Sequence, residues 1–282
     1  MTTTSSEYHI PSKDQKQEWA QEQTVLKRGL ILHDDHPDWT ATFKDNSDLE
    51  SVQGLKYIGG VDLSFIVGNK EDAIASLVVL SYPELQVVYE NHAKVKLTLP
   101  YIAGYLAFRE VGPLMDLITT IRRDQPTLVP QLIFVDGCGV LHPRGFGLAS
   151  HLGLLANIPT IGCSKNYLVI DGDGPVLGAH PPQFKTLFRE FVAEHPEARG
   201  QILLRGTVTG KTYGAALSAT TSKAVEGTLN PIFVSVGHKV SLETSVALVR
   251  ACSRFRVPEP IRQADLKSRT EIKKWCNEHA SS

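Results

Sequence analysis

Three carboxylates interrupt otherwise apolar stretches of this 282-residue sequence. Asp62 lies inside GGVDLSF, Glu110 follows YLAFR, and Asp136 ends LIFVD. Removing a carboxylate from water is costly unless a cation, a capping group or a metal ion compensates. If the three side chains meet, their hard oxygens suit Mg²⁺ or Mn²⁺. A site of this kind most often hydrolyses a phosphodiester, because the ion activates water and stabilises charge on the attacking and leaving oxygens.

Each of these residues also has a structural interpretation that the sequence leaves open. Asp136 precedes a glycine and can be an ordinary turn residue. Asp62 can face solvent from its strand, and Glu110 can be a solvated helix residue. His238 follows PIFVSVG and precedes an expected helix. It can be a loop residue, or it can approach the carboxylates as a general acid or base or as an outer metal ligand.

Strands are expected on either side of these carboxylates. Three come in succession, and the short turns between them favour an antiparallel meander. The first contains Gly59 and Gly60, which would thin the strand where nucleic acid or metal-bound water comes close. The expected ranges are 57–65, 73–82 and 85–97 for these strands, 100–125 for a helical segment interrupted at Gly112 and Pro113, and 131–139 for a fourth strand.

The order of these elements predicts where the carboxylates lie. A connection through a helix places the fourth strand parallel to the first, and next to it. Asp62 on the first strand and Asp136 at the end of the fourth would then be neighbours. Glu110, on the intervening helix, would point at the same place.

The rest of the chain alternates between strand and helix signals. Residues 1–12 are expected to be disordered, 13–275 to form a single catalytic domain, and 276–282 to be a flexible C-terminus. Ser241 is expected to cap a helix, with Glu243 in its first turn. The other expected elements are a helix at 13–33, a polar loop at 33–54, a helix at 144–158, a strand at 159–165, a surface excursion at 171–200, a hairpin at 201–220, a strand running into a helix at 231–255, and a basic helix at 258–275.

Composition excludes several classes of protein. With 29 basic and 30 acidic side chains, the chain is not a polycation that holds nucleic acid by bulk charge. Residues 250–274 carry eight Lys or Arg against three Asp or Glu, and could either meet phosphates or form a solvated helical face. Four scattered cysteines indicate reduced thiols, and neither a secretory signal nor a membrane-spanning run is expected. These features predict a soluble, intracellular protein.

Several motifs together resemble the endonuclease V family. They are GGVDLSF, PYIAGYLAFRE, VDGCGVLHPRGFGLASHLG, IGCSK and SVGHKVSLETS, in the family's order, over roughly residues 55–265. SLVVLSYPELQVVYE and RFRVPEPIRQAD are more similar to animal than to bacterial members. The resemblance implies an α/β, ribonuclease H-like fold: a mixed central sheet, with an antiparallel meander and parallel strands, flanked by helices. That agrees with the order of elements above.

The resemblance also implies roles for individual residues. Asp62, Asp136 and Glu110 match the acidic metal site, and His238 matches the active-site histidine. Lys165 matches a lysine near the scissile strand. Two further sets are implied: a wedge that enters the base stack, formed by Pro100, Tyr101, Ile102, Ala103 and Gly104, and a pocket for the extruded base, lined by Gly137, Gly139, Leu141 and His142.

The function implied is a Mg²⁺-dependent endonuclease, with Mn²⁺ as a substitute, specific for inosine. It would cut the second phosphodiester 3′ to inosine in single-stranded RNA and leave 3′-hydroxyl and 5′-phosphate ends. Alternatives are a DNA repair enzyme for deoxyinosine, a protein that binds inosine RNA without cutting it, and a ribonuclease H-like nuclease that does not read inosine. A monomer in the cytoplasm and in the nucleus or nucleolus, with no membrane partner, is expected.

Overall fold

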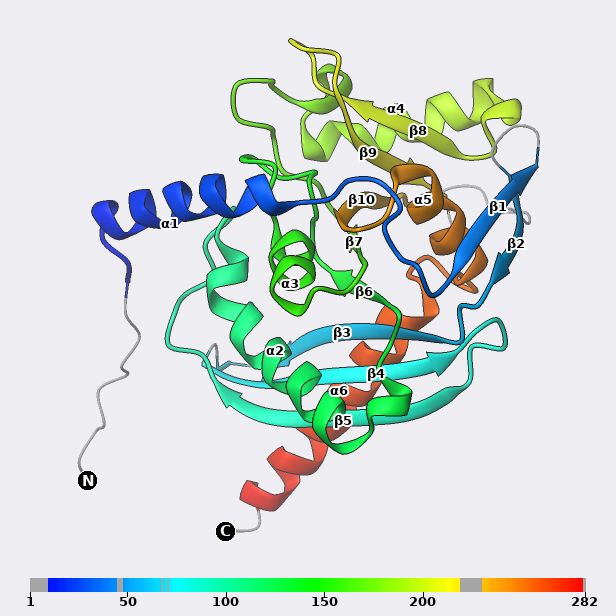
Figure 1. The fold of residues 1–282 in the computed structure, drawn as a ribbon. Helices are drawn as coiled ribbons and strands as arrows, with labels where there is room; N and C mark the ends of the chain where they lie inside the picture. The colour runs from blue at the N-terminus through cyan, green and yellow to red at the C-terminus, as the bar shows by residue number, and fades with distance from the viewer. Residues whose placement is uncertain (1–9, 45–47, 67, 70, 219–229, 281–282) are drawn as a thin grey trace.

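The computed structural model describes residues 10–44, 48–66, 68–69, 71–218 and 230–280. Within these residues, eight strands form one mixed sheet in the order β5-β4-β3-β6-β7-β10-β9-β8 (Figure 1). A two-stranded hairpin, β1-β2, stands apart from this sheet. The strands are β1 (Thr40–Lys44), β2 (Asp48–Gln53), β3 (Tyr57–Phe65), β4 (Asp72–Ser81), β5 (Val87–Lys96), β6 (Leu132–Asp136), β7 (Thr160–Ser164), β8 (Gln201–Arg205), β9 (Thr212–Leu217) and β10 (Ile232–His238).

The sheet has the topology predicted from the spacing of the apolar runs. β3, β4 and β5 form an antiparallel meander, and β6 pairs parallel to β3. β7 continues the parallel part, whereas β10, β9 and β8 are antiparallel. The prediction of a mixed sheet that combines a meander with parallel strands is confirmed.

Helices cover both faces of the sheet. Figure 1 shows α2 in front of the β3-β4-β5 meander and α6 behind it. The helices are α1 (Lys13–Leu26), α2 (Leu106–Asp124), α3 (Leu148–Ala156), α4 (Pro181–Glu194), α5 (Leu242–Ala251) and α6 (Glu259–Ala280), with short 3₁₀ turns at Lys27–Gly29, Pro126–Leu128, Val176–Gly178 and Pro196–Ala198. None of the described helices is both long and apolar enough to cross a bilayer.

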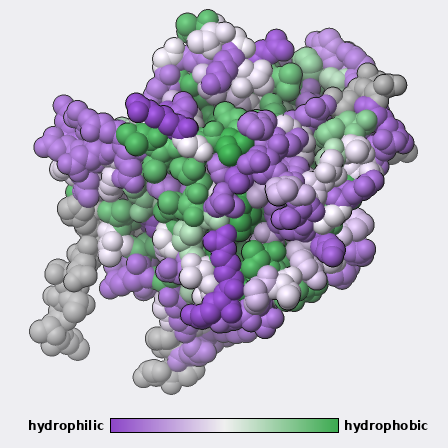
Figure 2. Space-filling model, viewed as in Figure 1, coloured by the Kyte–Doolittle hydropathy of each residue, from purple (hydrophilic) through white to green (hydrophobic). Residues whose placement is uncertain are grey.

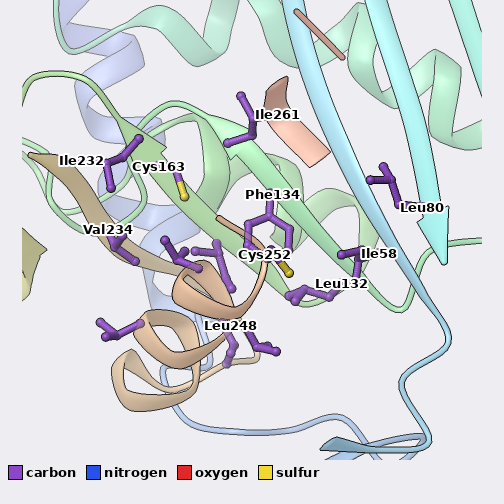
Figure 3. Packing of buried hydrophobic residues seen from close by; sticks show 14 of the residues in the cluster. Ile58, Leu80, Leu132, Phe134, Cys163, Ile232, Val234, Leu248, Cys252 and Ile261 are labelled. Atoms are coloured by element: carbon purple, nitrogen blue, oxygen red, sulfur yellow. The ribbon is translucent and has the colours of Figure 1, made fainter. Parts of the chain in front are cut away.

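Alternate residues of the central strands enter two different cores. Ile58 and Phe134 belong to the core under α5 and α6, together with Leu248 and Ile261 (Figure 3). Their neighbours along the strands, such as Val61 and Val135, pack instead with α2 and α3. Because side chains of a strand point alternately to opposite faces, the sheet is buried on both sides.

Position 60 requires a glycine for a structural reason that the sequence did not reveal. A Cβ at this position would lie 2.0 Å from the carbonyl oxygen of Pro260, at the start of α6. The glycine therefore lets α6 pack directly on β3. The idea that it leaves room for nucleic acid or metal-bound water is wrong, because helix backbone fills that space.

Three helical and loop boundaries differ from the predictions. The segment 33–54, expected to be a loop, contains the β1-β2 hairpin, in which β-branched and aromatic residues pair despite the polar composition. The helix expected at 13–33 ends at Leu26, before a 3₁₀ turn. The helix expected from Pro100 begins at Leu106 and passes through Gly112 and Pro113 unbroken. Gly112 permits this because it has no Cβ to clash with the following proline ring.

The basic segment 250–274 is a packed part of the fold. Four of its cations form ion pairs with carboxylates: Arg262 with Glu259, Lys267 with Glu90, Arg269 with Asp265, and Lys274 with Glu271. This pairing favours the solvated helical face over a phosphate-binding tail.

On the face of the molecule seen in Figure 2, hydrophilic side chains cover α1 and the periphery, and hydrophobic ones gather toward the middle.

The predicted domain boundaries remain predictions. Most of the N-terminal segment expected to be disordered, residues 1–9, lies outside the described residues. α6 continues to Ala280, into the segment 276–282 for which we predicted a flexible terminus, and residues 281–282 lie outside the described residues. Ser12 caps α1, and Ser241 caps α5 as expected, each by accepting a backbone hydrogen bond of 3.1 Å.

Candidate active site

The register of β3 and β6 brings two of the predicted carboxylates to the same level. Val61 pairs with Val135, so Asp62 and Asp136 follow in adjacent parallel strands. Both side chains line a cavity of about 200 Å³. The predicted neighbourhood of these two residues is therefore present in the structure.

Glu110 lines the same cavity from α2. Only 7% of its surface is exposed, so it is not a solvated helix residue. Burial raises the pKa of Glu110 to about 8, and the charges of Asp62 and Asp136 act in the same direction, against the opposing effect of Arg109. At neutral pH this carboxyl keeps its proton unless a cation approaches it.

Asp62 is held between its own strand and α6. Its Oδ2 accepts hydrogen bonds from Ser64 (3.2 Å) and Ser268 (3.3 Å). Burial, together with the charges of Asp136 and Asp265, raises the pKa of Asp62 to about 6, against the opposing effect of the Ser64 hydrogen bond.

Asp265 is a fourth carboxylate that the sequence reasoning missed. It lies on α6, one turn before Ser268, and its charge reaches both Asp62 and Lys165. Its side chain also pairs with Arg269 at 2.8 Å. The only signal in the sequence was an acidic residue three positions before a serine in a basic helix. Nothing in that pattern indicates that the helix packs on the first strand of the sheet.

The chemistry of the cavity fits a divalent cation. Its donors are hard carboxylate oxygens. Burial, and after it the repulsion between the carboxylates, raises the pKa of Asp62 and Glu110, and a cation would relieve both effects. Among the described residues, no group of three or more His, Cys, Asp or Glu side chains is already close enough to hold an ion. The carboxylates that would hold it are Asp62, Asp136 and Glu110.

Lys165 is the positively charged partner of Asp136 in this structure. Its Nζ lies 2.9 Å from Asp136 Oδ2, immediately after β7. Burial alone would lower the pKa of Lys165, but Asp136, with help from Asp62 and Asp265, raises it. About half of the lysine side chain is exposed, so it can also meet a phosphate; its predicted contact with the nucleic-acid backbone stays a prediction.

The wedge segment is a loop between β5 and α2. Tyr101 is 66% exposed, and it lines both the carboxylate cavity and a second cavity beside it. Gly104 ends the loop at a φ of +81°, a conformation that favours glycine. An exposed aromatic ring at the junction of two cavities is well placed to stack on a base.

We expect Tyr101→Ala to weaken binding of an inosine-containing oligonucleotide about tenfold, because base–aromatic stacking contributes about 1–3 kcal/mol. The ring makes no contact that holds the carboxylates, so the affinity for a divalent cation should change less than twofold. Fluorescence anisotropy measures the first quantity and isothermal titration with Mn²⁺ the second. Loss of cation binding in this variant would contradict the wedge role.

The second cavity contains only part of the predicted base pocket. Gly137 and His142 line it, together with Cys138 and Lys165. Leu141 does not, because it is fully buried in the core beside α4. A Cβ on Gly139 would lie 1.9 Å from the carbonyl oxygen of Val236, so this glycine allows two backbone segments to meet. Leu141 and Gly139 thus lie behind this lining, and their part in a base pocket stays a prediction.

His238 is not close to the carboxylates. It pairs with Thr160 at the start of β7, whereas Asp136 pairs with Cys163 near the end of that strand. Three residues of extended strand span about 10 Å. His238 Nδ1 accepts a hydrogen bond from the Ile31 amide (3.3 Å), and burial, followed by Lys239, lowers its pKa. The expected approach to the metal cluster is therefore not seen, and its catalytic role stays a prediction.

Comparison with known proteins gives this arrangement a family. The family model described as endonuclease V matches residues 40–266, which is well over half of the chain. The chain belongs to the endonuclease V family. Endonuclease V from Homo sapiens is 41% identical over 257 residues, which cover 91% of this chain and 83% of the human protein.

Two solved endonuclease V structures share the fold. The catalytic domain of human endonuclease V superposes with a TM-score of 0.77 at 40% identity, over 95% of this chain and 99% of that one. Endonuclease V from Ciona intestinalis, solved with a 23mer DNA containing an inosine followed by a ribo-adenosine, gives a TM-score of 0.78 at 35% identity, over 94% of this chain and 99% of that one.

Membership of the endonuclease V family confirms several expectations from the sequence. The fold is α/β and ribonuclease H-like, and the most similar relatives include animal members. The family consists of metal-dependent nucleases, so this endonuclease V relative is a hydrolase. The three carboxylates that line its cavity agree with that chemistry, and a protein that only binds nucleic acid would have no evident use for them.

Proposed function

We propose that this protein is a Mg²⁺-dependent endonuclease that recognises inosine in single-stranded RNA and cleaves the second phosphodiester on its 3′ side. The products would carry 3′-hydroxyl and 5′-phosphate ends. The observation that carries the proposal is the pair of adjoining cavities. Tyr101 and Asp136 line both of them, so a base held in one places its neighbouring phosphates beside the carboxylates of the other.

The second cavity has the character needed to read a base edge. It is about 220 Å³ in volume and is lined in part by the glycines Gly104, Gly137 and Gly147. Glycines allow backbone N–H and C=O groups to approach a bound base closely. Hypoxanthine presents O6 as an acceptor and N1–H as a donor, whereas adenine presents the reverse pattern. Fixed backbone groups can therefore accept one base and reject the other.

Inosine recognition is also supported by a relative. The Ciona protein was solved with DNA that contains an inosine followed by a ribo-adenosine. Its fold matches this chain over nearly its whole length. That complex contains a ribonucleotide next to the inosine, which is compatible with an RNA substrate here and with DNA as the alternative.

The three carboxylates of the first cavity, and Lys165 from the second, have distinct parts in the proposed reaction. When bound, the divalent cation would activate water and stabilise the charge on the departing oxygen. Asp62, Asp136 and Glu110 would hold it, with Mn²⁺ able to substitute for Mg²⁺. Glu110 gives up its proton as positive charge arrives. Lys165 exchanges its contact with Asp136 for one with a substrate phosphate.

Matched oligonucleotides test the proposed function. RNA and DNA strands of one sequence, with inosine or adenosine at a single position, are incubated with the protein and either Mg²⁺ or EDTA. We expect inosine RNA to be cut at least about 100-fold faster than adenosine RNA, since a hydrogen-bonding site strongly rejects the wrong edge. Equal cutting of the adenosine strand would contradict inosine recognition. Faster cutting of inosine DNA than of inosine RNA would favour the repair alternative.

The pH dependence of stability tests the cation site without any substrate. The folded state holds the protons of Asp62 and Glu110 more tightly than the unfolded chain, since their pKa values are raised to about 6 and about 8. In EDTA, these groups therefore make stability fall as pH rises from about 4 to about 8. One pKa unit corresponds to about 1.4 kcal/mol, so the two raised pKa values together lower the stability by several kcal/mol across this range.

We expect Mg²⁺ to raise the melting temperature more at pH 8 than at pH 5, because the cation replaces protons that have been lost at the higher pH. Differential scanning fluorimetry measures this difference. The double variant Asp62→Asn, Glu110→Gln is the control and should show no pH-dependent effect of Mg²⁺. A Mg²⁺ effect of equal size at both pH values in the unaltered protein would argue against the site.

The proposal also covers where and in what form the protein works. We propose a monomer that acts in the cytoplasm and in the nucleus or nucleolus. Light scattering of the purified chain tests the first point, and imaging of a tagged chain tests the second.

A further inference from the structure

Gln23 is the one buried residue of α1, and its side chain reaches the second cavity. Its Nε2 donates hydrogen bonds to the carbonyl oxygens of Gly104 (3.2 Å) and Phe146 (3.1 Å). Its Oε1 accepts a hydrogen bond from Arg144 Nε (2.6 Å). α1 lies before residues 40–266, the part of the chain that matches the family model. The helix thus contributes a fully hydrogen-bonded amide to a cavity built mainly from later segments.

The carbonyl of Gly104 is the point on which this network converges. It accepts from Gln23 Nε2, from His142 Nε2 (3.1 Å) and from the Arg144 guanidinium. His142 Nδ1 accepts from the Arg144 amide (3.2 Å), so its Nε2 carries the proton. Three donors thus share the two lone pairs of this one oxygen, at the end of the loop that carries Tyr101.

The docking of α1 does not depend on Gln23 alone. Trp19, one turn earlier, stacks on Phe108 of α2 with ring centroids 4.9 Å apart and an interplanar angle of 12°. Trp19 also packs against the ring of Tyr105, with centroids 5.8 Å apart. α1 therefore keeps apolar contacts if the Gln23 amide is lost. This separates the attachment of the helix from the hydrogen bonds that the amide makes to the loop.

We propose that Gln23 is a positioning residue that fixes the Tyr101 loop against the base cavity by clamping the carbonyl of Gly104. This inference rests on the proposed function for its consequence, which is discrimination between inosine and adenosine. A loop held by its last carbonyl keeps the aromatic ring at one distance from the cavity mouth. A loose loop would let either base be accommodated, since the shape of the cavity would adjust to it.

Two variants separate hydrogen bonding from packing. Gln23→Met keeps most of the side-chain volume but removes both donors and the acceptor, whereas Gln23→Ala removes the volume as well. Thr24→Ala is the matched control, because the Thr24 hydroxyl bonds only within α1, to the carbonyl of Ala20. All three are compared with the unaltered full chain.

Hydrogen exchange measures the clamp without any substrate. We expect amides of residues 97–106 to exchange at least about fivefold faster in both Gln23 variants, with exchange in β3 and β6 unchanged. In cleavage assays with Mg²⁺, the ratio of kcat/KM for inosine RNA to that for adenosine RNA should fall at least about tenfold, mainly through KM. Thr24→Ala should leave both measurements unchanged.

Other outcomes overturn the inference or separate it from the proposed function. Unchanged exchange at 97–106, or full discrimination retained in Gln23→Met, would show that Gln23 only fills space. An equal loss for both substrates together with a lower melting temperature would show that it only stabilises the fold. If the unaltered protein does not distinguish inosine from adenosine, the proposed function fails, whereas the exchange experiment still decides whether Gln23 clamps the loop.

Discussion

Asp136→Asn lowers cleavage by about 1,000-fold or more and leaves the fold intact. The amide keeps the shape of the carboxylate but loses the charge that a divalent cation requires, and it no longer matches the ammonium of Lys165 at 2.9 Å. Single-turnover cleavage of a labelled inosine oligonucleotide in Mg²⁺ measures the loss. The melting temperature in EDTA should not fall, since the substitution removes a negative charge that repels Asp62.

Asp116→Asn is the matched control for this prediction. The substitution makes the same chemical change at an exposed position of α2. Asp116 does not line the cavity. Its cleavage rate should stay within about twofold of the unaltered protein. Activity of Asp136→Asn within about tenfold of the unaltered protein would rule out Asp136 as a ligand of the ion.

Gly60→Ala lowers the free energy of unfolding by about 3 kcal/mol or more, as expected when a side chain is forced into a filled space. Its new Cβ would lie 2.0 Å from the carbonyl oxygen and 2.1 Å from the carbonyl carbon of Pro260. These are backbone atoms, so α6 must shift away from β3 to make room. Cleavage should fall too, because α6 carries Ser268, which donates a hydrogen bond to Asp62.

Gly59→Ala on the same strand is the control. Its Cβ would meet the side chain of Pro130 at 3.0 Å, on the opposite face of the sheet. A side chain can move by a few tenths of an ångström, so we expect a loss of only about 1 kcal/mol. Urea denaturation followed by circular dichroism compares the two. Equal losses would mean that the approach of α6 to Gly60 does not limit stability.

The central part of the site was predictable because it depends on the order of local elements. Short turns between apolar runs fixed the meander, and a helix before the next run fixed a parallel crossover. Once β3 and β6 are neighbours, the register of their pairing places Asp62 and Asp136 side by side. Glu110 then faces them from α2, which has to cover that side of the sheet.

The other features of the site and fold depend on tertiary contacts, which the periodicity of apolar residues does not predict. The position of Asp265 depends on where α6 lands, and Gly60 reveals that contact only when the backbone of Pro260 is seen beside it. The level of His238 is set by its antiparallel pairing with β7, which sends the end of β10 away from Asp136. The sequence predicted a break in the helix at Gly112 and Pro113, because a Gly-Pro pair usually marks one, whereas α2 is continuous there.

Because α6 follows β3 and β6 in the chain, the carboxylate site is completed later in synthesis than the strands that carry it. β3 and β6 leave the ribosome long before α6, and domains fold as their segments emerge. Until α6 docks, Asp62 lacks the hydroxyl of Ser268 and the strand lies uncovered beside Gly60. A nascent chain therefore completes its carboxylate site only after residues 259–268, more than 120 positions beyond β6, have emerged and docked.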